Sequence, residues 1–179
     1  MTNPGFPLIP RARHPVIVTS TAAFDALPPA DAVTALIAVC SSPAWAAAVA
    51  AGRPYGDLDS LLAAADTALA DLDDLSDALA GHPRIGERAV HSATSAKEQS
   101  GMASASDEVR TAMAERNAEY ERRFGHVYLV CASGRSADEL LAVLTERLEN
   151  TPEQEAARTR AELAAINRLR LTGLIVQDR

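Results

Sequence analysis

Apolar residues recur along most of the chain at three- and four-residue intervals, the spacing that places them on one face of an α-helix. In the first half, this pattern predicts a helix after Pro28-Pro29 and a second one from Ser42 to Gly52, with serine as N-cap and Pro43 at the first helical position. A third helix is predicted from Asp57, and a short acidic one over residues 72–79. The apolar positions that define the first three are Val33, Leu36, Ile37, Cys40, Trp45, Val49, Leu58, Leu61, Leu62, Ala65 and Leu69.

The second half predicts three longer helices and one segment of a different kind. A polar helix should run from Ser106 to about Phe124 and end at Gly125, and a small helical turn should include residues 95–99. Two capping-box patterns, at residues 136–139 and 151–154, open the last two helices. Their apolar faces carry Leu140, Val143, Leu144 and Leu148, and then Leu163, Ile166 and Leu174. Between Gly125 and these helices, residues 126–132 form a short, apolar, β-like run.

These elements predict an all-α fold: a single helical bundle-like domain over residues 21–179, with one short extended segment near 126–132. Residues 81–94 have no clean period and indicate a loop. The first 20 residues hold Pro4, Pro7, Pro10 and Pro15 without periodicity, so we expect residues 1–20 to be a flexible proline-rich N-terminal arm. Of this arm, only Val16-Ile17-Val18 looks able to pack.

Composition agrees with a helical domain. The chain has 179 residues, a length that fits one domain. Hydrophobic residues make up 47% but aromatic residues only 4%, and much of the apolar content is alanine and leucine. Alanine loses no side-chain entropy in a helix, and strand-forming residues are scarce, so helix is favoured.

Charge and targeting signals exclude several classes of function. The net charge of −7, with basic residues interleaved among acidic ones, argues against nucleic-acid binding. We find no secretory signal, no apolar run long enough to cross a membrane and no peroxisomal C-terminus. Two cysteines, Cys40 and Cys131, do not make a disulfide framework, and both are interpreted as buried structural thiols. We expect a cytoplasmic protein without a membrane partner.

The loop around residue 82 is the first candidate for chemistry. His82 precedes Pro83, which biases it away from helix, and a histidine held in a loop suits acid–base chemistry near neutral pH. The alternative, favoured by the residues alone, is a loop histidine bonded to a carbonyl. A metal site made of His82, Glu87 and His91 is disfavoured, because no two of them stand four residues apart on a segment that the pattern predicts to be helical, and no aspartate follows nearby.

Two further positions are candidates on helical geometry. In a helix, Ser95, Glu98 and Gln99 would share one face and form a polar recognition surface, although a plain capping box explains Ser95 and Glu98 equally well. On the last helix, Arg170 follows the apolar face, whereas Arg168 lies about 200° from Ile166 and faces solvent. An inward arginine needs an anion or a carbonyl as partner, from the protein or from a ligand.

These segments together resemble one known family. The chain is similar to OHCU decarboxylases, which act on 2-oxo-4-hydroxy-4-carboxy-5-ureidoimidazoline (OHCU) in urate degradation. The resemblance covers residues 22–175, in order. The strings that carry it are Gly81–Gly86 and Ser95–Gly101, supported by Cys40–Trp45, Arg53–Tyr55, Tyr120–Gly125, Arg147–Asn150 and Leu169–Leu171.

The resemblance implies a cofactor-free, metal-free carboxy-lyase, usually a homodimer, that converts OHCU to (S)-allantoin. It implies His82 as the catalytic acid–base residue, assisted by Glu98. The substrate contacts that it implies are Pro83, Ser95, Ala96, Lys97, Glu98, Gln99, Tyr128, Leu129, Val130, Cys131, Ala132 and Arg170. A catalytically silent ligand-binding protein and a metal-dependent hydrolase are the alternatives from other classes.

Overall fold

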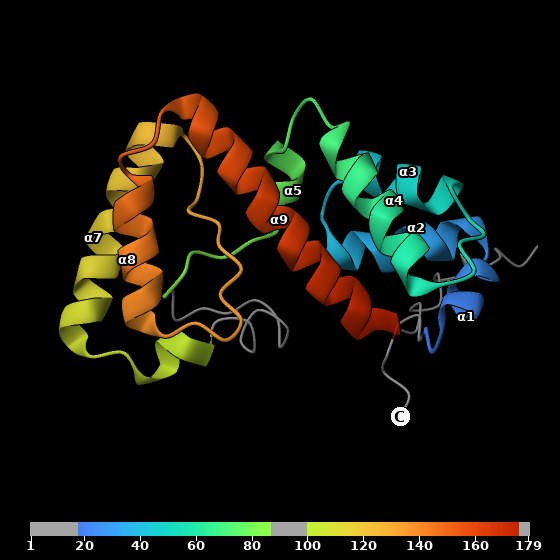
Figure 1. The fold of residues 1–179 in the computed structure, drawn as a ribbon, viewed down its shortest axis with the longest axis horizontal. Coiled ribbons are helices and arrows are strands. Elements are labelled where there is room, and N and C mark those ends of the chain that lie inside the picture. The colour runs from blue at the N-terminus through green and yellow to red at the C-terminus, as the bar shows by residue number, and fades with distance from the viewer. Residues whose placement is uncertain (1–17, 87–99, 176–179) are drawn as a thin grey trace, which may run out of the picture.

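The computed structural model describes residues 18–86 and 100–175, and these residues fold into α-helices joined by loops (Figure 1). No described residue lies in a β-strand, so the predicted all-α class is confirmed. The helices are α1 (Thr21–Asp25), α2 (Pro29–Val39), α3 (Pro43–Ala51), α4 (Leu58–Ala70), α5 (Ser76–Ala80), the 3-10 helix η1 (Ser100–Ser104), α7 (Asp107–Phe124), α8 (Ala137–Arg147) and α9 (Pro152–Ile175).

Local side-chain caps set where the helices begin. The Ser42 hydroxyl accepts from the Trp45 amide at 3.3 Å, and an Asp57 carboxylate oxygen accepts from the Ser60 amide at 2.7 Å. Ser136 and Glu139 form a reciprocal capping box, which satisfies backbone amides that the first turn leaves unpaired. These predicted caps are confirmed. They could be predicted from the sequence because each joins residues only three positions apart.

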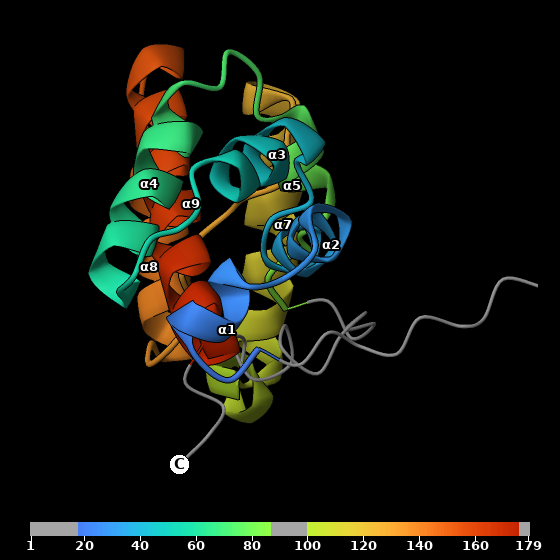
Figure 2. The ribbon, with the colours of Figure 1, turned by 90° about the vertical axis from the view of Figure 1, so that its right-hand side faces the viewer.

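Two hydrophobic clusters form the interior. The first lies among α1–α5 and one face of α9, and the second lies among α7, α8 and η1. Figure 1 shows α9 running between these two groups of helices, and Figure 2 shows α4 alongside α9. Leu163, Ile166 and Leu171 bind α9 to the first cluster, so this long helix is the element that fixes the two groups relative to each other.

The segment over residues 126–132 is extended and lies between the clusters. Tyr128, Val130 and Ala132 belong to the second cluster, whereas Leu129 belongs to the first and Cys131 packs against it. This alternation is the two-residue period of extended backbone. The predicted extended segment is therefore confirmed, but in the described part of the chain it pairs with no neighbouring strand.

Several predictions fall outside the described residues. The small helical turn at 95–99 lies entirely outside them, as do Glu87 and His91. Of the predicted arm over residues 1–20, the structure describes only 18–20, where Val18 is buried in the first cluster. Within the described ranges, no helix is long and apolar enough to cross a membrane.

Candidate active site

His82 lies just after α5, where a short helix gives way to irregular backbone. Its amide donates to the Leu79 carbonyl oxygen at 3.0 Å, and Pro83 restricts the backbone that follows. The side chain is buried, with 9% of the residue exposed. A buried imidazole whose backbone is held on both sides has the fixed position that proton transfer requires.

A narrow crevice of about 20 Å³ brings His82 together with the extended segment. That volume holds about one water molecule and is too small for a whole ligand. The crevice therefore marks only the line of contact between the His82 loop and the extended segment. Its lining residues come from the loop after α5, the segment after α7, and α9: His82, Pro83, Ile85, Tyr128, Leu129, Val130, Cys131, Ala132, Ser133, Ile166 and Leu169. The structure thus brings together His82, Pro83 and residues 128–132 of the sequence-predicted site.

One backbone edge of the extended segment is held from outside the crevice. The Leu129 carbonyl accepts from Arg147 Nη1 at 2.6 Å, and the Cys131 amide donates to Glu162 Oε2 at 2.9 Å. In extended backbone, the polar groups of alternate residues point to the same side, so those of Val130 point the opposite way. Val130 lines the crevice, and among the described residues neither its N–H nor its C=O has a hydrogen-bond partner. One donor and one acceptor on the same residue, pointing to the same side, can bind an amide or a ureido group.

Arg168 and Arg170, near the end of α9, differ as the helix-face prediction requires. Arg168 is exposed, and its Nε donates to Asp66 Oδ2 at 2.8 Å on the surface. Arg170 is half-buried, and its Nη1 donates to the Val39 carbonyl oxygen at 3.0 Å. One partner of the inward guanidinium is therefore a backbone carbonyl at the end of α2. Whether Arg170 binds a ligand stays a prediction.

The cysteines are not equivalent. Cys40 is fully buried, and burial raises the pKa of its thiol. Cys131 is only half-buried, and it lines the crevice. The interpretation as a buried structural thiol therefore holds for Cys40 and is wrong for Cys131, because the extended segment turns one side of Cys131 toward the crevice.

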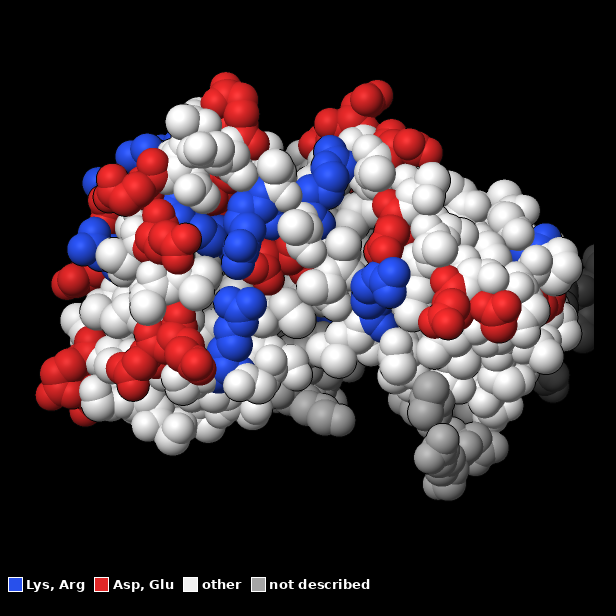
Figure 3. Space-filling model, in the orientation of Figure 1, with Lys and Arg blue, Asp and Glu red and all other residues white. Residues whose placement is uncertain are grey.

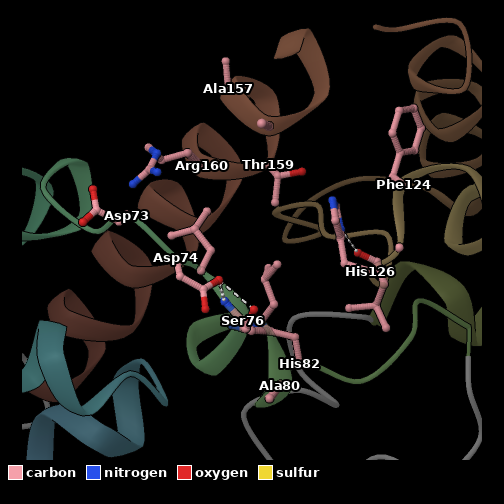
Figure 4. A pocket seen from close by; sticks show the side chains of 15 residues that line it. Asp73, Asp74, Ser76, Ala80, His82, Phe124, His126, Ala157, Thr159 and Arg160 are labelled. Carbon is pink, nitrogen blue, oxygen red and sulfur yellow. Dashed lines mark hydrogen bonds between the residues drawn. The ribbon is translucent and has the colours of Figure 1, made fainter. Parts of the chain in front are cut away.

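A larger cavity of about 690 Å³ lies on the other side of His82, between α5, α9 and the corner after α7 (Figure 4). Several of its polar groups are bonded to nearby backbone or side chains. Arg160 Nη2 donates to the Leu72 carbonyl at 2.9 Å, Asp74 accepts from Ser76, and His126 Nδ1 lies 3.0 Å from the Val127 carbonyl oxygen. We place the candidate active site at the crevice, because there His82 lies with the backbone N–H and C=O of Val130, which have no partner among the described residues.

A buried polar cluster behind the extended segment was not predicted from the sequence. Arg147, Glu155 and Tyr120 are almost fully buried, and Arg147 Nε donates to Glu155 Oε1 at 2.9 Å. The spacing carried a signal for it. Arg147 stands three residues after the apolar Leu144, and Glu155 stands eight before Leu163, so both fall on the inward faces of their helices.

Metal binding finds no support in the described residues, where no three His, Cys, Asp or Glu side chains gather as ligands. Since Glu87 and His91 lie outside that part, the expected absence of a metal stays a prediction.

Comparisons with known proteins agree on one family. A family model described as OHCU decarboxylase matches residues 25–172. The uric acid degradation bifunctional protein TTL of Arabidopsis thaliana is 28% identical over 144 residues, which cover 75% of this chain and 43% of that protein. The 2-oxo-4-hydroxy-4-carboxy-5-ureidoimidazoline decarboxylase of Amia calva is 41% identical over 59 residues, 33% of this chain and 34% of that protein. The chain thus spans less than half the length of each of these curated relatives.

Two solved structures share the fold. A crystal structure of OHCU decarboxylase in the presence of (S)-allantoin matches with a TM-score of 0.69 at 28% identity, covering 79% of this chain and 96% of that chain. A crystal structure of (S)-allantoin synthase matches with a TM-score of 0.70 at 18% identity, covering 88% of this chain and 54% of that chain. The second likeness concerns the fold alone.

Proposed function

The chain belongs to the OHCU decarboxylase family, and from this premise we propose that it converts OHCU to (S)-allantoin in urate degradation, as a carboxy-lyase without a cofactor. The observation that carries the proposal is the crevice. It places His82, the acid–base residue that the family resemblance implies, against an extended backbone edge suited to a ureido-substituted ring.

The substrate can serve as its own electron sink. Breaking the bond to the carboxylate releases CO₂ and leaves an electron pair on the ring carbon. The C=N bond to the neighbouring ring carbon can accept that pair on its nitrogen. A proton must then be delivered to that neighbouring carbon, which bears the ureido group, while the hydroxyl of the decarboxylated carbon becomes a carbonyl and its proton passes to the ring nitrogen. Decarboxylases commonly need a cofactor to accept the electron pair that the departing CO₂ leaves behind. Here, positioning and proton transfer are sufficient.

His82 supplies the proton in this proposal. Its burial against one wall of the crevice allows proton delivery from one side of the ring, which gives a single enantiomer. Glu98 is proposed to favour protonated His82 by charge proximity and to hold the ring. Glu98 lies outside the described residues, as do the other proposed contacts of that segment: Ser95, Ala96, Lys97 and Gln99.

The rest of the proposed site binds the ring and the ureido group. Val130 offers its backbone amide and carbonyl to the substrate, and Pro83 forms an apolar part of the wall beside His82. Arg170 is proposed to grip a ring or ureido oxygen where negative charge develops. A grip on the departing carboxylate would stabilise the ground state and slow the reaction. A homodimer and a cytoplasmic location, which the resemblance and the sequence predict, stay proposals.

The test is the decay of freshly generated OHCU, made by oxidising urate in the same cuvette. The purified protein is expected to accelerate this decay well beyond the spontaneous rate, and treatment with EDTA should leave the acceleration unchanged. A protein that binds (S)-allantoin without accelerating the decay would be a silent ligand-binding relative. A loss of activity that zinc or manganese restores would favour the metal-dependent hydrolase instead.

A further inference from the structure

The extended segment at the crevice is held by charged side chains that lie outside the crevice. We propose that Glu162, together with Arg147, is a positioning residue: it fixes the backbone of residues 129–131 so that the opposite edge, at Val130, meets the substrate. This inference rests on the proposed function, because Glu162 is proposed to position the backbone of the same substrate-binding site.

Glu162 is well placed for this task. It lies on α9 one turn before Ile166, which lines the crevice, and its side chain is only 7% exposed. One carboxylate oxygen accepts from the Cys131 amide at 2.9 Å. The other accepts from Arg158 Nε at 3.0 Å and Nη2 at 2.8 Å. With both oxygens engaged, the carboxylate has a fixed direction, and a hydrogen bond to a charged acceptor is stronger than one between neutral groups.

Arg147 holds the same edge two residues earlier. Its Nη1 donates to the Leu129 carbonyl at 2.6 Å, while Nε and Nη2 bind the buried Glu155. The Glu155 carboxylate also accepts from the Tyr120 hydroxyl and from Asn150 Nδ2, so the guanidinium on α8 is anchored to α7, to α9 and to the turn between α8 and α9. These two anchors hold the consecutive peptide groups on either side of the Val130 Cα, which leaves the backbone of Val130 little freedom to rotate.

The expected signature is a change in substrate binding. A contact from Val130 to the ureido group or ring is made in the ground state and in the transition state alike. Disordering it therefore raises KM and leaves kcat nearly constant. General loss of stability acts differently, since it lowers the fraction of active enzyme and with it the apparent kcat.

Two conservative variants of Glu162 distinguish the effect of side-chain length from the effect of charge. Glu162→Gln keeps the length of the side chain and one acceptor oxygen, whereas Glu162→Asp keeps the charge but is one methylene shorter. We expect Glu162→Gln to stay within about twofold of the wild-type KM, and Glu162→Asp to raise KM by about tenfold, the effect of losing one hydrogen bond to a charged group. Arg158→Gln is the matched control, because it removes the ion pair to Glu162 but leaves the bond to Cys131.

The outcomes are distinct. A wild-type KM in Glu162→Asp, or an Arg158→Gln variant with the same defect, overturns the positioning role while the decarboxylase activity stands. An inactive wild-type protein refutes the proposed function itself. If Glu162→Asp does not fold, hydrogen exchange of the Cys131 amide in the wild type decides: strong protection supports the bond to Glu162, and exchange as fast as in an unfolded peptide overturns it.

Discussion

At the scale of single residues, the proposed chemistry depends on where a few polar side chains are held. His82 follows α5 directly, is bonded through its amide to Leu79, and is buried against the crevice. Arg170 reaches the end of α2 from α9, whereas Arg168 two residues earlier stays on the surface. Each position is set by helix geometry and by the residue next to it.

The first prediction concerns the acid–base pair. His82→Asn keeps approximate size and some hydrogen bonding but removes the imidazole that is proposed to deliver the proton, so the enzymatic rate should fall by about 10²–10⁴-fold. Glu98→Gln should also reduce it. If both act on one proton transfer, the double variant should be little slower than His82→Asn alone. The rates are measured as OHCU decay above the spontaneous background, and fully additive losses would place the two side chains in separate steps.

The second prediction compares the two arginines. Arg170→Lys keeps the charge but loses the planar guanidinium that can bond two groups at once, so turnover should be strongly impaired. Arg168→Lys should be nearly silent, because it changes only a surface ion pair with Asp66. Both variants are compared by kcat/KM under the same conditions. Similar losses at the two positions would contradict the orientation of α9.

At the scale of elements, the buried cluster ties three helices to the site. Tyr120 comes from α7, Arg147 ends α8 and Glu155 begins α9. Burial acts to raise the pKa of the Glu155 carboxyl, but hydrogen bonds from Arg147, Tyr120 and Asn150 outweigh it and hold that pKa below its ordinary value of 4.5. The ionised carboxylate therefore stabilises the folded protein.

The third prediction follows from that shift. A carboxyl whose pKa is lowered by folding stabilises the protein fully above its unfolded pKa, and the contribution is lost as pH falls through the folded pKa. Glu155→Gln leaves Arg147 buried without its ion pair, which should cost about 3–5 kcal/mol at neutral pH. Urea unfolding should show the difference from wild type shrinking as the pH falls below the ordinary carboxyl pKa.

Glu119→Gln is the control for this measurement, since it breaks an exposed ion pair with Arg116. It should change the free energy of unfolding little at any pH. A Glu155→Gln variant whose deficit stays constant down to acid pH would show that the carboxylate charge is not what stabilises the cluster.

The elements also show what the sequence can predict. Helix starts such as Ser42, Asp57 and Ser136 were predictable because a capping side chain accepts from the backbone amide only three residues further along the chain. The buried cluster was not, because Tyr120 and Glu155 are brought together only by packing of α7 against α8 and α9. The proposed role of His82 came from the family resemblance, since its local sequence fits a carbonyl-bonded loop residue as well.

At the scale of the whole molecule, the site lies where two separately packed groups of helices meet. α9 joins them, and the extended segment runs between their hydrophobic clusters. Figure 3 shows basic side chains along the course of α9 with acidic ones on either side, and Arg158 and Arg168 are both in ion pairs there. The crevice therefore depends on both groups of helices and on the single helix that holds them in place.

The most direct test of the central claim is the handedness of the product. OHCU decays spontaneously to racemic allantoin, so rate alone is weaker proof of catalysis than stereochemistry. Urate oxidation coupled to the wild-type protein and followed by circular dichroism should show a growing signal of (S)-allantoin. The same reaction with His82→Asn should show a signal that approaches that of the racemate. A wild-type reaction without dichroism would contradict the proposed activity, and full (S) handedness at an unchanged rate in His82→Asn would show that another residue delivers the proton.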